Sequence, residues 1–352
     1  MKQELRELQI QLGAIFEEGS MVASSFGNDR PSIAAARNGV ALCDRSHRGF
    51  LQLKGEDRLR FLHNQTTNNI NALQNGQGCD TVFVTSTGRT IDLATVYATE
   101  ESLLVLVSPN RREQLMQWMD RYIFPMDQVE LADITDENAI LNLIGDRSDS
   151  LVKELGAQTI IGQPEGSHIF IDEGIRIGVG SGLALPGYTL IVPTEAAAGV
   201  WSQLTSAGAI LMGDRAWEQL RIMQGRPTCD RELTDDYNPL EAGLWKAISF
   251  DKGCYIGQET IARLNTYKGV KQRLWGVKLS APVAANTPVT YEGDKVGILT
   301  SYTDTEDGAF GLGYVRTKVG GEGLKVEIGE SSGELVSVPF LTHEYYNPSN
   351  KV

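Results

Sequence analysis

Apolar and polar positions alternate over short segments in the first third of the chain, and this pattern predicts strands. Residues 50–54 (FLQLK) show the alternation clearly. An acidic turn at 55–57 then leads into apolar residues at helical spacing, which predicts a helix from about Arg58. The same reasoning predicts strands at 81–85, 91–98, 103–107 and 129–133 and a helix at 111–123.

A second cycle of elements follows. The succession strand–helix–strand–strand–helix–strand recurs about twice, which is typical of two ferredoxin-like α+β units. Before the first cycle, residues 1–16 predict an amphipathic helix, and the residues from there to about 45 predict a loop. The second cycle predicts strands at 139–144, 168–172, 175–179 and 188–192, and helices at 148–155 and 194–207, the latter with Thr194 as N-cap.

The pattern changes near residue 275, where we expect a domain boundary. Turns rich in glycine separate short alternating runs, and no helical periodicity is visible beyond this point. Several short strands at such spacing predict a small antiparallel barrel or sandwich. The runs lie at 274–279, 288–291, 295–301, 310–315 and 324–328.

Composition narrows the class of protein. The 352 residues include 45 acidic and 32 basic side chains, a net charge of −13, with 41% hydrophobic residues. These values fit a soluble protein of two or three domains. The charge argues against generic binding to nucleic acid or to an anionic membrane, because both are negative. The apolar segment 103–107 is too short to span a bilayer. The N-terminus does not read as a signal peptide, so we expect a cytoplasmic protein, or an organelle stroma or matrix protein if a transit peptide was removed.

The cysteines are scattered, and one of them lies in an unusual segment. Cys43, Cys79, Cys229 and Cys254 form no CxxC pair and no zinc-finger spacing, so no metal site is predicted and a reducing compartment fits. Residues 252–259 read KGCYIGQE, with two glycines around Cys254 and a lysine two residues before it. A nearby lysine can lower the pKa of a thiol. A structural cysteine in a glycine-bounded loop is the alternative.

The octapeptide KGCYIGQE resembles the K-G-C-Y-x-G-Q-E signature of the YgfZ family, which is related to the glycine-cleavage T-protein. The resemblance covers about residues 35–345. Further blocks similar to this family lie at 55–58, 61–68, 88–92, 220–227, 238–242 and 268–273.

The resemblance implies an α+β fold of three domains around a central folate channel, with tetrahydrofolate as the ligand. Residues 1–48 with 135–272 would form a discontinuous ferredoxin-like domain 1, and residues 49–134 a ferredoxin-like domain 2. Residues 273–352 would form a C-terminal antiparallel β-barrel.

The resemblance also implies a set of site residues. Cys254, Lys252 and Asp92 would carry the chemistry. A carboxylate at Asp92 suits a pterin, because it accepts hydrogen bonds from N–H groups. A solvated strand-end acid is the alternative for this residue. Contacts with the cofactor are implied for Asp92, Arg221, Tyr255, Gly257, Gln258, Glu259 and Arg263.

The function that the resemblance implies is folate binding in support of iron–sulfur cluster assembly or repair, with an effect on tRNA modification. Iron–sulfur client or assembly proteins would then be partners. The alternative is a tetrahydrofolate-dependent aminomethyltransferase of the T-protein type, so enzymatic activity stays open. One departure weighs against the alternative. T-proteins carry L-R-L-E-A-G, whose glutamate lies in the folate site, and residues 220–225 read LRIMQG, with neutral Met223 in its place.

Residues 260–291 contain five basic side chains and no acidic one. This reversal within an acidic chain indicates either an exposed basic face or a docking surface for the glutamate or polyglutamate tail of folate. RNA is a rival ligand because Tyr267 and Trp275 are interleaved, but the net charge makes nucleic acid the least expected partner. The basic residues are Arg263, Lys268, Lys271, Arg273 and Lys278.

Overall fold

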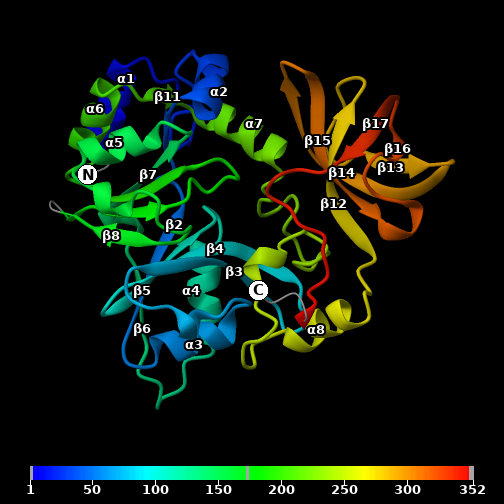
Figure 1. Ribbon diagram of the computed structural model, residues 1–352, viewed down its shortest axis with the longest axis horizontal. Coiled ribbons are helices and arrows are strands. Elements are labelled where there is room, and N and C mark those ends of the chain that lie inside the picture. The colour runs from blue at the N-terminus through cyan, green and yellow to red at the C-terminus, as the bar shows by residue number, and fades with distance from the viewer. Residues whose placement is uncertain (1–2, 172–173, 349–352) are drawn as a thin grey trace. The chain divides into compact units, whose positions relative to one another are not determined.

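The strands of the protein form two open sheets and one closed barrel (Figure 1). This computed structural model describes residues 3–171 and 174–348. The predicted α+β fold class, with two sheet-containing parts and a C-terminal antiparallel barrel, is confirmed. The chain divides into two compact units, of residues 1–61, 71–79 and 95–220 and of residues 62–70, 80–94 and 221–352. The three domain boundaries expected from the sequence stay a prediction.

One sheet has six strands in the order β11-β1-β7-β10-β9-β8, and its neighbours are antiparallel except for the parallel pair β1 and β11. The helices α5 (Ser148–Glu154) and α6 (Ala197–Ser206) contact β10. The indole of Trp201, wholly buried, belongs to the apolar core here. The strands are β1 (Ala41–Asp44), β7 (Asn138–Ile144), β8 (His168–Phe170), β9 (Arg176–Val179), β10 (Gly187–Pro193) and β11 (Ile210–Met212).

The second sheet has five strands in the order β3-β4-β5-β2-β6. Every side chain of β5 is buried, which matches its nearly continuous apolar sequence, and eight of the nine side chains in β4 are buried. The strands are β2 (Gly49–Lys54), β3 (Gln77–Val84), β4 (Thr90–Ala98), β5 (Ser102–Val107) and β6 (Glu130–Asp133).

The barrel closes in the order β12-β15-β14-β13-β16-β17, with antiparallel pairs throughout. Alternate residues of β12, namely Trp275, Val277 and Leu279, belong to its apolar core, as the two-residue period of a strand requires. Closure needs β17, which the sequence reading did not include. The strands are β12 (Gln272–Leu279), β13 (Pro288–Tyr291), β14 (Asp294–Thr305), β15 (Gly308–Arg316), β16 (Lys325–Ile328) and β17 (Ser331–Val336).

Two local expectations are wrong. The residues between 17 and 45, expected to form a loop, contain α2 (Asp29–Asn38) and β1, because Ile33 and Ala36 of α2 are buried in an apolar cluster. Thr194 is not the N-cap of α6. Ala196 occupies that position, and the Thr194 hydroxyl donates to the Asp136 carbonyl at 2.9 Å. The remaining helices are α1 (Gln3–Gln11), α3 (Arg58–Gln65), α4 (Arg112–Asp120), α7 (Asp214–Gln224) and α8 (Gln258–Thr266).

Candidate functional site

The C-terminal end of α3 is held by a lysine from a distant part of the sequence. The last carbonyls of a helix have no partner within it. The Lys252 ammonium donates to three carbonyl oxygens around this end. They belong to His63, Thr66 and Asn68, at 2.5, 2.6 and 2.7 Å. Lys252 is 8% exposed, so the three protons of its ammonium are used within the fold, where the charge also complements the helix dipole.

Further bonds join the same two segments. The Ile256 N–H donates to the Asn64 carbonyl at 3.0 Å, which satisfies another carbonyl in the last turn of α3. The Thr67 hydroxyl donates to the Ala247 carbonyl at 2.7 Å. The segments 63–68 and 247–256, far apart in the sequence, therefore form one local structure. The second segment runs into the octapeptide 252–259, which is called the cysteine motif below.

Gly257 fixes the other end of the cysteine motif. It is the N-cap of α8 and has φ +79°, in the left-handed region that side chains disfavour. A Cβ at this position would lie 2.5 Å from the Thr85 carbonyl oxygen, in the turn between β3 and β4. In that same turn, a Cβ at Gly88 would lie 3.3 Å from the Gly257 carbonyl oxygen. Only glycine lets the motif pack this closely against the turn.

Cys254 is exposed between these fixed points. The adjacent Tyr255 is buried, its burial raises the pKa of its phenol, and the Lys252 ammonium lies 4.7 Å from its ring centroid. The contacts of Lys252 favour a clamp that shapes the loop over the direct effect on the thiol suggested by the sequence. The loop thus presents a thiol to solvent from a rigid base.

Asp92 is wholly buried on β4 and contacts a second cysteine. The thiol of Cys229 lies 3.1 Å from Asp92 Oδ1 and donates to it. Because a thiol is a weak donor, this hydrogen bond is a weak one. Asp92 is therefore not the solvated strand-end acid that was its alternative interpretation.

A further carboxylate lies on the 238–242 motif. Glu241 is 6% exposed, and burial raises its pKa, although the Asn238 N–H donates to it at 3.1 Å and Arg89 lies 3.8 Å away. Its raised pKa makes Glu241 a candidate functional carboxylate, because perturbed pKa values are enriched at functional sites.

Arg221 takes part in a buried network. It lies in α7, is 0% exposed, and donates to Glu232 at 3.0 Å and to the Ser301 hydroxyl of the barrel at 2.9 Å. Glu232, also 0% exposed, accepts from the hydroxyls of Thr300 and Ser301 at 2.7 and 2.6 Å. The bonds of its guanidinium to Glu232 and Ser301, rather than its burial, favour a structural role for Arg221 over the predicted contact with a cofactor. In the same helix, Met223 is half-buried.

The remaining predicted residues lie on α8. Gln258 and Glu259 form its first turn, and Arg263 is exposed near its end. Among the other basic residues of the acid-free stretch, three are exposed, whereas Arg273 is half-buried with its guanidinium 5.5 Å from the Tyr345 ring centroid. The exposed three are Lys268, Lys271 and Lys278.

Cys229 and Glu232 were not found by sequence reasoning. Cys229 lies 137 residues from Asp92, and no sequence motif joins the two as a pair. For Glu232 a signal existed, because an arginine on the apolar side of a helix needs an acidic partner when it is buried. Sequence alone did not say which acid this is.

The described ranges contain neither a metal-binding cluster nor a membrane-spanning helix. Within residues 3–171 and 174–348, no group of three or more His, Cys, Asp or Glu side chains could hold a metal ion. Across that part of the chain, no helix combines the length and apolar character that crossing a membrane requires.

The fold and these motifs define a protein of the T-protein type. Residues 11–252 match the family model of the GCVT N-terminal domain. The chain is 45% identical to an Arabidopsis thaliana protein whose name describes a chloroplastic transferase, over 98% of this chain and 81% of that protein. The protein therefore belongs to the GCVT family of aminomethyltransferase-like proteins.

More distant relatives agree with this family. An aminomethyltransferase of Rubrobacter xylanophilus is 29% identical, over 89% of this chain and 86% of the relative. The crystal structure of the glycine cleavage system aminomethyltransferase T from Bartonella henselae superposes with a TM-score of 0.87 at 18% identity, covering 98% of this chain and 99% of the other. At that identity the superposition shows the fold alone.

Proposed function

We propose that this protein is a YgfZ-like member of its family, which binds tetrahydrofolate and supports the assembly or repair of iron–sulfur clusters. The observation that carries the proposal is the exposed thiol of Cys254 on a loop clamped by Lys252. Such a loop keeps the thiol accessible and its position constant, as a repeated encounter with a partner protein requires.

The cysteine inventory limits what Cys254 does. Cys43 and Cys229 are buried and Cys79 is half-buried. Iron–sulfur clusters are normally held by four ligands, so a cluster that contacts Cys254 would be shared with a partner protein, a second copy of the chain or a small thiol. The thiol would act as a transient ligand, a one-carbon contact or a redox group.

Asp92 is the proposed folate contact in a tetrahydrofolate channel. Its carboxylate, buried beside the Cys229 thiol, would have to be uncovered to accept hydrogen bonds from pterin N–H groups. The exposed cations Arg263, Lys268 and Lys271 would attract the carboxylates of the glutamate tail. A chloroplastic relative supports an organelle stroma as the location, with the cytoplasm as the alternative.

Two measurements test this proposal. In titrations with tetrahydrofolate, Asp92→Asn should weaken binding and Cys254→Ser should leave it unchanged. In cells with an iron–sulfur defect, Cys254→Ser should abolish complementation, and the matched control Cys79→Ser should retain it. Full complementation by the Cys254 variant would refute the thiol role.

The second candidate is a tetrahydrofolate-dependent aminomethyltransferase. Relatives named aminomethyltransferase, at 26–29% identity over most of the chain, favour it. Met223 weighs against it, because a thioether accepts only weak hydrogen bonds from a pterin. The discriminating assay mixes the protein with tetrahydrofolate and an aminomethylated lipoyl carrier. Formation of methylene-tetrahydrofolate at a catalytic rate would establish the transferase and displace the first proposal.

A further inference from the structure

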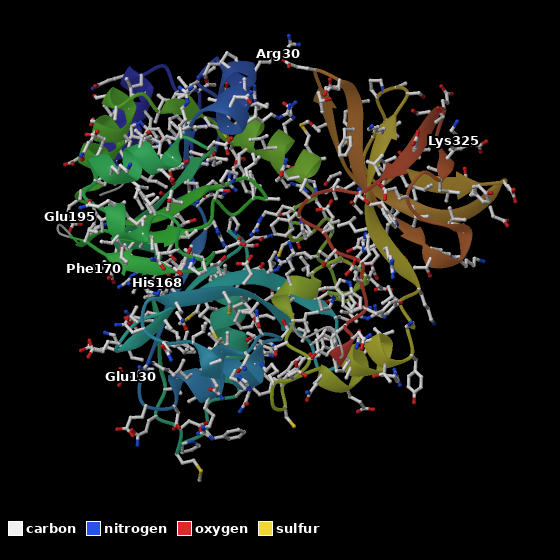
Figure 2. The ribbon with its side chains drawn as sticks, in the orientation of Figure 1. Arg30, Glu130, His168, Phe170, Glu195 and Lys325 are labelled. Carbon is white, nitrogen blue, oxygen red and sulfur yellow. The ribbon has the colours of Figure 1, made fainter. Side chains whose placement is uncertain are left out.

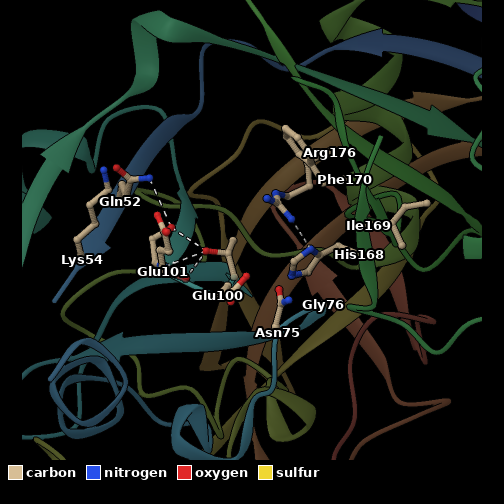
Figure 3. A pocket seen from close by; sticks show the side chains of 12 residues that line it. Gln52, Lys54, Asn75, Gly76, Glu100, Glu101, His168, Ile169, Phe170 and Arg176 are labelled. Carbon is tan, nitrogen blue, oxygen red and sulfur yellow. Dashed lines mark hydrogen bonds between the residues drawn. The ribbon is translucent and has the colours of Figure 1, made fainter. Parts of the chain in front are cut away.

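A pocket of about 580 Å³ opens in the first unit, and none of the residues assigned above lines it (Figure 3). Its walls come from the end of β2, the turn before β3, the turn between β4 and β5, and the hairpin of β8 and β9. The lining side chains include Lys54, Asn75, Glu100, His168, Phe170 and Arg176.

Arg176 brings a positive charge into this pocket. Phe170 and Arg176 are partners in the register of β8 and β9, and the guanidinium carbon lies 5.3 Å from the Phe170 ring centroid. Arg176 is half-buried, and burial lowers the pKa of its guanidinium with no contribution from an acidic neighbour. Within residues 3–171 and 174–348, the structure pairs Arg176 with no carboxylate.

The group that holds Arg176 is a neutral imidazole. His168 is 3% exposed, and its Nε2 lies 2.9 Å from the Ala98 carbonyl oxygen, which can only accept, so Nε2 carries the proton. Its Nδ1 therefore has the lone pair that accepts the Arg176 N–H at 2.8 Å. Burial, and then the charge of Arg176, lower the pKa of His168 to about 4. His168 thus orients the guanidinium without neutralising its charge.

The surroundings of Arg176 add an apolar surface. Figure 2 labels His168 and Phe170, which come from the same strand. The Phe170 ring is 64% exposed, and Ile169 beside it also lines the pocket. The turn between β4 and β5 adds Glu100 and Glu101 to the lining, and their negative charges would repel a ligand with several anionic groups.

We propose that this pocket binds a small organic monoanion, with its oxyanion on the Arg176 guanidinium and its apolar body against Phe170. An arginine with a fixed orientation suits the two oxygens of a carboxylate or a phosphate ester, since its N–H groups form a planar fork. An aromatic ring gives the body of such a ligand a stacking partner. This site is independent of the proposed folate and thiol chemistry.

The experiment is calorimetric titration of the full chain with four probes: benzoate, acetate, phenyl phosphate and inorganic phosphate. We expect benzoate to bind more tightly than acetate, and phenyl phosphate, which carries more charge near neutral pH, to bind more weakly than benzoate. Equal binding of acetate and benzoate would refute the apolar subsite, and preference for inorganic phosphate would refute an organic ligand.

Variants connect the binding to its residues. Arg176→Met should lower the affinity for benzoate by at least about tenfold, because the variant loses a charge-assisted contact. Phe170→Ala should lower the affinity for benzoate severalfold and leave the affinity for acetate unchanged. Arg316→Met, at an exposed arginine of the barrel, is the matched control. If Arg176→Met does not fold, Arg176→Lys keeps the charge without the fork and should still weaken benzoate. Unchanged benzoate affinity in the folded Arg176 variant would overturn the proposal.

Discussion

Replacing Lys252 by methionine tests the clamp between α3 and the cysteine motif. Methionine keeps much of the length of the side chain and removes the ammonium that donates to His63, Thr66 and Asn68. Hydrogen bonds to a charged group contribute about 1.5–3 kcal/mol each. The cost of burying the ammonium offsets part of their sum, and breaking a buried ionic contact costs about 3–5 kcal/mol. We expect a loss of about 3 kcal/mol.

Hydrogen exchange measures this loss where it occurs. A loss of about 3 kcal/mol corresponds to roughly a hundredfold faster exchange in the last turn of α3 and in residues 66–68, if these amides exchange by local opening. Urea unfolding should show a lower midpoint with an unchanged slope. Lys246→Met is the matched control, since Lys246 is exposed in the same segment and should change stability by less than about 0.5 kcal/mol.

The alternative is that the Lys252 ammonium acts only on the Cys254 thiol and does not stabilise the end of α3. On that view, Lys252→Met leaves exchange and unfolding as in the unmodified protein and changes only the reactivity of Cys254. Exchange rates within threefold of the unmodified protein would show that the carbonyl contacts do not stabilise this region, and the clamp would have to be given up.

Three further predictions concern other parts of the chain. Gly257→Ala should lower the free energy of unfolding by about 2 kcal/mol or more, because the alanine would combine a left-handed φ with a clash against a backbone carbonyl. Gly199→Ala on α6, where a Cβ meets nothing within 4 Å, is the control and should be neutral or stabilising in the same thermal unfolding assay. The pKa of His168 is about 4 in the folded state and about 6.5 in the unfolded state, so the unfolded state takes up the proton first as the pH falls. The neutral imidazole therefore contributes roughly 3 kcal/mol to the free energy of unfolding. This contribution is fully present above pH 6.5 and is lost as the pH falls toward 4. Proton NMR of its imidazole should give this value, and a pKa above 6 would contradict it. Arg221→Met should cost about 3–5 kcal/mol in urea unfolding by leaving Glu232 buried without its partner, and the double variant with Glu232→Gln should recover part of that loss.

Periodicity predicted the elements whose burial follows their own sequence. β4, β5 and β12 carry apolar residues at strand spacing, and the structure contains each of them. α2 was missed because its apolar face is short and lies in a polar segment, so only packing in its apolar cluster distinguishes it from a loop. The barrel was expected from short strands, but β17 was missed because its SSGELV sequence is weakly apolar.

The sequence by itself determined the family motifs and the position of Cys254 between two glycines. The exposure of Cys254 and the need for glycine at Gly257 follow from the tertiary structure. Tertiary structure alone decided what the polar groups touch. Lys252 bonds to a carbonyl 189 residues away, and Arg221 reaches a hydroxyl 80 residues away. The physical reason is that periodicity and turn chemistry act over a few residues, whereas a buried charge is satisfied by whichever groups the fold brings within hydrogen-bond distance. A sequence motif therefore identifies a residue, but only the fold determines which group that residue contacts.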